Sequence, residues 1–93
     1  MYIGLLTFEL FISDSLSLKD KRMIVSSLKD RLRKKYNVAI AELGYQEKWQ
    51  RAELGIVTIG NSHKIVEESL NKIFGYLDSQ TGFELIAHQF EYL

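Results

Sequence analysis

The 93-residue sequence contains no cysteine and no proline. Without cysteine the chain has no disulfide framework and no thiolate chemistry. Without proline, nothing in it forces a break in a helix or a strand. The longest run free of charged residues extends only from Leu54 to His63, far short of the ~20 apolar residues of a membrane-spanning helix. No basic segment or small-residue cleavage pattern suggests a signal peptide, so we expect a cytoplasmic protein with no membrane partner.

The composition is typical of one ordinary folded domain covering residues 1–93. Hydrophobic residues make up 46% of the chain and charged residues 26%, which is too apolar for a disordered segment. Twelve basic and twelve acidic side chains cancel. The total charge therefore does not favour nucleic acid as a partner.

Apolar periodicity predicts two helices and four strands. The spacing of Ser17 and Asp20 is a near relative of the capping box and starts the first helix at Leu18. Asn61 or Ser62 is expected to cap the second helix. The predicted elements are, in order, strand 2–12, helix 18–37, strand 38–44, hairpin 45–50, strand 52–60, a helix after 61–62 that ends within 79–82, and strand 83–93.

This order is that of the ferredoxin-like βαββαβ fold, an α+β sandwich. Right-handed crossovers give an antiparallel four-stranded sheet in the order 4-1-3-2 with both helices on one face. Apolar residues occupy both sides of the predicted strand 52–60, so the pattern leaves open which side is buried. The face without helices carries more apolar residues than a lone domain usually exposes, which suggests a homodimer that forms through this face or through edge strands. The expected dimer-interface residues are Ile3, Leu5, Phe11 and Leu85.

Charge is unevenly distributed along the chain. Between Lys19 and Lys35, eight basic residues stand against two acidic ones, a net charge of +6, and the rest of the chain carries −6. Four cations fall within an arc of about 80° opposite the apolar stripe of the predicted helix: Lys19, Arg22, Lys29 and Arg33. Such a ridge could bind phosphates or could simply be a solvated face.

The start of the predicted first helix is also crowded with cations. Lys19, Lys21 and Arg22 surround the positive end of the helix dipole, where a docked anion would offset the repulsion. Alternatively, these long side chains extend into solvent, where salt screens them.

The predicted fold brings this helix start and hairpin 45–50 to the same end of the sheet. Gln46, Trp49 and Arg51 supply the amide, stacking surface and guanidinium that single-stranded RNA sites use. Alternatively, Trp49 folds back into the core, with Arg51 paired to Glu53 or Glu42. The candidate nucleic-acid or anion-binding residues are Lys19, Lys21, Arg22, Lys29, Arg33, Gln46, Trp49 and Arg51.

Motifs for catalysis, cofactors and metals are missing. His63, expected in a first helical turn, and His88, expected to be partly buried, have no second ligand at metal spacing. Acylphosphatases share the predicted element order, but segment 13–16 lacks the glycines and the arginine of their phosphate loop. The RNA recognition motif shares it too, but strand 52–60 has no aromatic residue on which a base could stack. We therefore expect a protein that is not an enzyme and holds no cofactor or metal.

Four segments carry a family resemblance: 17–22, 35–38, 41–44 and 46–52. Their sequences are SLKDKR, KYNV, AELG and QEKWQRA, and they closely resemble the YlxP-like small bacterial proteins, a family of unknown function. The resemblance implies a ferredoxin-like fold and a cytosolic protein. Members often lie in gene clusters with a translation initiation factor and a ribosome-binding factor, which implies ribosome assembly or translation. The family supplies no catalytic residues.

Two functions follow from these observations. The first is a non-catalytic binding protein for ribosomal RNA or a ribosomal subunit, whose affinity falls steeply with salt. The second is a homodimeric protein-interaction or small-ligand-binding module that uses the open sheet face and self-associates independently of salt.

Overall fold

The computed structural model describes residues 1–93 and contains six elements in the predicted order. Apolar periodicity placed each boundary within about two residues of its observed position. The elements are β1 (Tyr2–Phe11), α1 (Leu18–Lys35), β2 (Ala39–Gly44), β3 (Arg51–Gly60), α2 (His63–Ser79) and β4 (Glu84–Tyr92).

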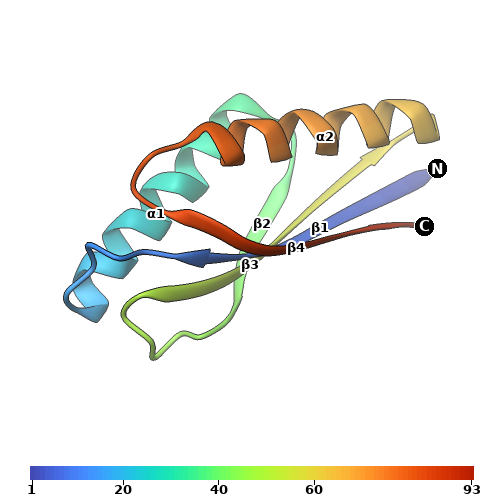
Figure 1. The fold of residues 1–93 in the computed structure, drawn as a ribbon. Coiled ribbons are helices and arrows are strands. Elements are labelled where there is room, and N and C mark those ends of the chain that lie inside the picture. Colours follow the sequence, from blue (N-terminus) through green and yellow to red (C-terminus); the bar gives the residue numbers. More distant parts are fainter.

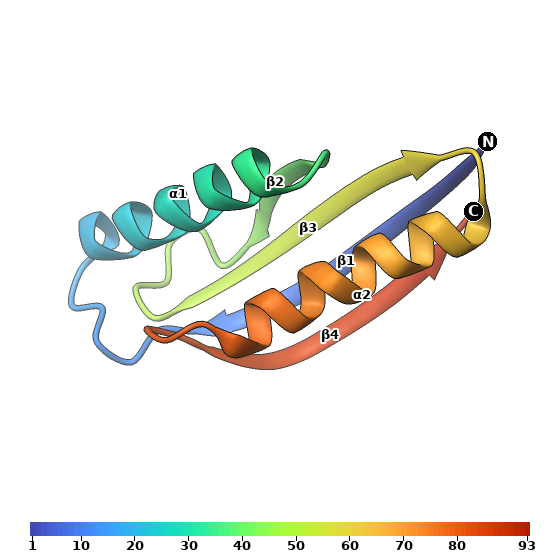
Figure 2. The ribbon, with the colours of Figure 1, turned by 90° about the horizontal axis from the view of Figure 1, so that it is seen from above.

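The four strands form one antiparallel sheet in the order β2-β3-β1-β4 (Figure 1). β1 lies inside the sheet and pairs with β3 along its whole length, with Tyr2 opposite Gly60 and Phe11 opposite Arg51. Figure 2 shows both helices on the same face, α1 beside β2 and α2 along β1. The ferredoxin-like fold predicted from the sequence is therefore confirmed.

The hydrophobic core lies between the sheet and the two helices. β3 contributes Ala52, Leu54 and Ile56 to it, which identifies the buried side of that strand. The other buried apolar residues are Leu6, Phe8, Leu10 and Ile12 of β1 and the residue after it, Val25, Leu28 and Leu32 of α1, Ile40 of β2, and Val66, Leu70, Ile73 and Leu77 of α2. Each fully buried aliphatic side chain stabilises the fold by roughly 1.5–3 kcal/mol.

α2 approaches β1 closely at Gly4. A Cβ atom at this position would lie 2.6 Å from Val66 Cγ1 and 2.7 Å from Leu70 Cδ1. Glycine therefore allows the first two turns of α2 to pack directly on the strand.

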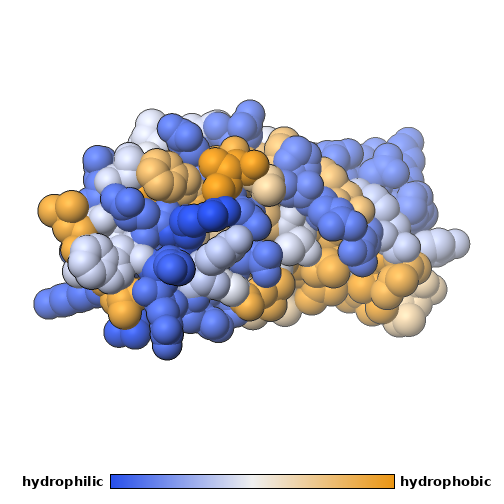
Figure 3. Space-filling view, turned by 60° about the horizontal axis from the view of Figure 1, so that its bottom comes forward, coloured by the Kyte–Doolittle hydropathy of each residue, from blue (hydrophilic) through white to orange (hydrophobic).

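The opposite face of the sheet carries no helix. Figure 3, turned toward this side, shows a continuous stretch of apolar side chains along the lower edge of one half and a mixture of hydrophilic and apolar side chains over the other half. Leu85 does not belong to this face: the ladder between β1 and β4 shifts between Glu9 and Leu10, so that Leu85 lies opposite Leu10 and packs against the core. The prediction of Leu85 as an open-face interface residue is wrong, because the bulge at Ile86 changes which β4 side chains face the helices.

The molecule is elongated, with principal extents of 42 × 20 × 18 Å. Both ends of the chain lie at one tip, where Ile3 and Leu93 exchange backbone hydrogen bonds of 3.0 and 2.8 Å. At the same tip, partial burial and the charge of Glu67 raise the pKa of Tyr92 above its usual value. The first turn of α1 and the β2–β3 hairpin lie at the other tip (Figure 1).

Candidate nucleic-acid interface

Local capping builds the first turn of α1. Ser17 Oγ accepts a hydrogen bond of 3.0 Å from the Asp20 N–H. The Asp20 carboxylate in turn accepts a hydrogen bond of 3.0 Å from the Leu16 N–H. The first bond is that of a capping box, but the Asp20 carboxylate reaches the N–H of Leu16, one residue before the N-cap Ser17, and not that of Ser17 itself. The carboxylate still places a negative charge at the positive end of the helix dipole.

Lys21 lies inside the protein. Its side chain is 1% exposed. Its Nζ donates hydrogen bonds to the carbonyls of Tyr45 at 2.6 Å and Arg51 at 3.3 Å, and it lies 3.1 Å from Oε2 of Glu42. The prediction of Lys21 as an anion-binding residue is wrong, and so is the alternative in which it extends into solvent, because its ammonium group is buried among oxygens of this chain.

The contacts of Lys21 join α1 directly to the hairpin. The predicted proximity of the helix start and the hairpin is therefore confirmed. Helical spacing contained the clue to its burial, because Lys21 precedes Val25 by four residues and Leu28 by seven, which places all three on one stripe.

The hairpin has a well-defined conformation. Tyr45 adopts a φ of 61°, in the left-handed region that non-glycine residues rarely enter. Its ring lies 4.5 Å from the Arg51 guanidinium, which also forms an ion pair of 2.7 Å with Glu9. Arg51 therefore pairs with Glu9 of β1, and the alternative in which it pairs with Glu53 or Glu42 is wrong.

The exposed face of α1 is shallow and strongly basic. The cations that line it are Lys19, Arg22, Arg31 and Lys34, and we call these four residues the α1 basic face. None of the four lies within 4.0 Å of a carboxylate oxygen. Asp30 lies on the same face, but its carboxylate pairs with Arg33 at 3.7 Å.

Two predicted members of the basic ridge lie to one side of this face. Lys29 is half-buried, and Arg33 donates a hydrogen bond of 3.4 Å to the Ile40 carbonyl of β2. The ridge predicted from the sequence is centred incorrectly, because the prediction did not include Lys21 in the buried stripe of α1. Arg31 and Lys34, which that prediction did not include, complete the exposed face instead.

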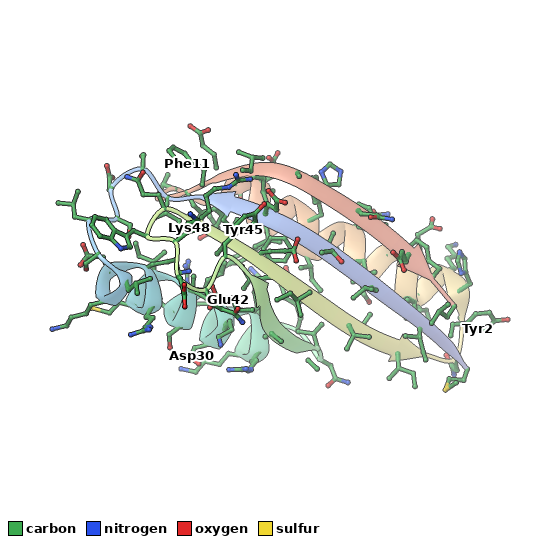
Figure 4. All side chains as sticks on the ribbon, turned by 90° about the horizontal axis from the view of Figure 1, so that it is seen from below. Tyr2, Phe11, Asp30, Glu42, Tyr45 and Lys48 are labelled. Carbon is green, nitrogen blue, oxygen red and sulfur yellow. The ribbon has the colours of Figure 1, made fainter.

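The hairpin presents aromatic and amide groups to solvent. Trp49 is 56% exposed, so its side chain does not fill the core, and Gln46 is also exposed. Trp49 and Phe11 line a recess of about 390 Å³ beside the hairpin. Figure 4 shows Phe11, Tyr45 and Lys48 gathered at this tip of the molecule. The structure thus brings an exposed indole and the first turn of α1 to the same end.

The open sheet face holds a second candidate surface. Ile3 lies opposite Ile59, and Leu5 lies opposite Val57. Val57 is 38% exposed and Ile59 59% exposed, and Leu43, which covers Gly55, is 52% exposed. We call Ile3, Leu5, Leu43, Val57 and Ile59 the apolar patch.

Phe11 is separate from the apolar patch. Thr7 and Glu9 lie between Leu5 and Phe11 on the open side of β1, and Phe11 faces Arg51 across the ladder. The four residues expected at one dimer interface therefore lie in three places: Ile3 and Leu5 in the apolar patch, Phe11 at the end of β1, and Leu85 against the core.

No group of three His, Cys, Asp or Glu residues is arranged to hold a metal ion. His88 is exposed and not partly buried, and its ring centroid lies 4.4 Å from that of Phe74. Neither helix combines the length and the apolar character needed to cross a membrane.

Residues 3–90 match the family described as "Protein of unknown function (DUF503)". The chain belongs to the DUF503 family. The uncharacterized protein YlxP of Bacillus subtilis (strain 168) is 38% identical over 77 residues, which cover 83% of this chain and 84% of YlxP. The YlxP-like resemblance is confirmed, and membership of DUF503 assigns no activity.

Proposed function

We propose that the protein is a non-catalytic RNA-binding protein of the cytoplasm that associates with ribosomal RNA or a ribosomal subunit. The proposed contact surface is the α1 basic face together with Gln46 and Trp49 of the hairpin. The role in translation or ribosome maturation rests on the YlxP-like resemblance. The contact surface rests on the charges and exposures described above.

The observation that carries the proposal is the lack of carboxylate partners around the α1 basic face. Lys19, Arg22, Arg31 and Lys34 each lie more than 4.0 Å from any carboxylate oxygen. An unpaired cation keeps its full charge for a phosphate, and each phosphate it neutralises releases counterions from the nucleic acid. The formal net charge of the chain is +0, so this clustering is what gives the protein a surface attractive to RNA.

Trp49 supports the same function. An exposed aromatic ring close to cations is the combination that single-stranded RNA sites use for stacking and phosphate contact. The two hydrogen bonds from Lys21 hold the hairpin beside the first turn of α1. A single strand could therefore contact Trp49 and Arg22 together.

The proposal is tested by titrating the protein with single-stranded RNA and with small ribosomal subunits, at low and at physiological salt, while following Trp49 fluorescence. The double variant Lys19→Glu/Arg22→Glu reverses two charges of the α1 basic face. We expect it to bind at least about tenfold more weakly, and the slope of log affinity against log salt to fall by about 0.7 per lost phosphate contact.

The matched control is Lys64→Glu/Lys72→Glu. It makes the same change in net charge at two exposed positions of α2, and we expect it to bind as the wild-type protein does. Equal losses in the two variants would show that affinity follows net charge and would reject the α1 basic face as the site. A wild-type protein that binds neither RNA nor subunits would reject the function.

A second function, a homodimeric protein-interaction or small-ligand-binding module, is supported by the apolar patch. Monomers rarely leave large contiguous apolar patches in water. The five patch residues carry no charge, so self-association through them should be insensitive to salt. The partner in this case is a second copy of the chain, which is the commonest kind of oligomer contact.

Sedimentation equilibrium up to high micromolar concentration tests the second function. We expect a concentration-dependent dimer in the wild-type protein and a monomer in Ile59→Glu. Ile65→Glu is the matched control, because Ile65 is 53% exposed but lies on α2, on the helix side of the sheet. A wild-type protein that stays monomeric would count against this function.

A further inference from the structure

The recess beside the hairpin is a candidate ligand site distinct from the α1 basic face. Its volume is about 390 Å³, within the range of roughly 300–1,000 Å³ typical of small-molecule sites. The recess is shallow and largely open to solvent. Its lining residues are Phe11, Glu47, Lys48, Trp49, Gln50 and Arg51.

The walls of this recess are held in place by contacts to the rest of the protein. Gln50 Nε2 donates hydrogen bonds to the Ser13 carbonyl at 3.0 Å and the Ser15 carbonyl at 3.3 Å. The Gln50 carbonyl accepts a hydrogen bond of 2.8 Å from the Ile12 N–H. The Arg51 guanidinium is fixed by its ion pair of 2.7 Å with Glu9. Gln50 and Arg51 therefore form a fixed wall of the recess, which lowers the entropic cost of binding against that wall.

The chemistry of the lining favours a planar, polar, aromatic ligand. Trp49 and Phe11 supply two aromatic rings. Trp49 is 56% exposed and does not belong to the hydrophobic core. Glu47 supplies carboxylate acceptors and Lys48 supplies an ammonium donor at the rim. A nucleobase combines a flat ring for stacking with donors and acceptors along its edge, and single-stranded RNA can turn such a base out of its stack.

We propose that this recess receives one unstacked base of a single-stranded RNA, which stacks on Trp49 while the phosphates lie on the α1 basic face. This inference rests on the proposed function and adds the base-binding site to it. The sheet itself is not the stacking platform, because β3 has no aromatic residue. The end of β1 and the hairpin supply the stacking surface instead.

The experiment compares two oligomers of about eight nucleotides with equal numbers of phosphates, one an oligoadenylate and the other lacking its bases. The wild-type protein should bind oligoadenylate about 5- to 150-fold more tightly than the abasic oligomer, the range expected for one stacked base. Trp49 fluorescence should be quenched by oligoadenylate and not by the abasic oligomer.

Variants of a lining residue test whether the preference for oligoadenylate over the abasic oligomer depends on the recess. Trp49→Ala should remove the preference for oligoadenylate over the abasic oligomer, whereas Trp49→Phe should retain part of it. Tyr2→Ala, which removes a 42%-exposed aromatic ring at the opposite tip, should behave as the wild-type protein. Circular dichroism establishes that each variant is folded.

The remaining outcomes separate the two proposals. Equal, salt-sensitive binding of both oligomers would overturn the base site and leave the RNA-binding function standing. A base preference that persists in Trp49→Ala would place the stacked base elsewhere and also overturn the recess. No binding of either oligomer would overturn both.

Discussion

Lys21 fixes the geometry of the hairpin tip through a single ammonium group. Lys21 belongs to α1, whereas Glu42 lies in β2, Tyr45 directly follows it, and Arg51 begins β3. Burying a charge is costly unless it is paired and hydrogen-bonded, and three oxygens surround this one. The residue therefore positions the first turn of α1 against the hairpin and does not itself bind a ligand.

Replacing Lys21 by methionine should destabilise the protein by about 2–3 kcal/mol. The change removes the Lys21 hydrogen bonds to the Tyr45 and Arg51 carbonyls, of which Tyr45 keeps a second donor, the Lys48 N–H at 2.9 Å. It also leaves Glu42, which is 21% exposed, without a counter-charge. Urea denaturation measures the loss. The double variant Lys21→Met/Glu42→Gln should recover part of it, and exposed Lys72→Met should change stability by less than about 0.5 kcal/mol. Equal midpoints for Lys21→Met and Lys72→Met would contradict the buried role.

Replacing Gly4 and Gly75 by alanine should change the stability of the protein in opposite directions. Gly4→Ala drives a methyl group to within 2.7 Å of Val66 and Leu70 atoms, and overpacking of this kind costs about 1–3 kcal/mol. Gly75→Ala, inside α2, meets no atom within 4 Å and should stabilise the helix by about 0.5–1 kcal/mol. Thermal unfolding of the two variants checks the signs, and a stabilised Gly4→Ala would contradict the close approach of α2 to β1.

The two helices begin at serines that act differently. Ser17 Oγ accepts a hydrogen bond from the Asp20 N–H, whereas the Ser62 side chain makes no capping hydrogen bond. Ser17→Ala should therefore cost about 1 kcal/mol of unfolding free energy, and Ser62→Ala clearly less. Chemical denaturation of both variants measures the difference. Equal losses would mean that the cap of α1 contributes nothing specific.

The order and approximate limits of the elements were predictable because periods of 2 and 3.6 are strong in this chain. The placement of Leu85 was not, because the bulge at Ile86 leaves no mark in the local pattern. The pairing of Arg51 with Glu9 was equally inaccessible, since it depends on the register between β1 and β3. To predict a contact between distant segments, the register between the strands must be known. Periodicity predicts only which face of a strand or helix each residue occupies.

The candidate site was predictable in its location and less so in its membership. The net charge of residues 19–35 indicated a basic helix, and the fold predicted from the sequence placed the hairpin beside the start of that helix. Lys21 was assigned to the wrong side because a lysine is rarely buried, although its spacing matched the core. Trp49 was undecided because a tryptophan fits either a core or an exposed binding surface.

Across the whole molecule, stability should decrease from the centre of the sheet toward β2. β1 is paired on both sides along nearly all its length, while β2 pairs only with residues Glu53–Val57 of β3. Hydrogen exchange should therefore be at least about tenfold slower for ladder amides in the middle of β1 than for those in β2. Equal protection of the two strands would indicate that the sheet opens only as one unit.

The mutual hydrogen bonds of Ile3 and Leu93 place the two ends of the chain side by side, at the tip opposite the hairpin. A fusion partner or surface tether attached at either end would project away from Trp49 and the start of α1. A short glycine linker could also join the ends, with new ends opened in another loop, because the gap to be bridged is small. The molecule is therefore suited to immobilisation with its proposed RNA-binding tip directed outward.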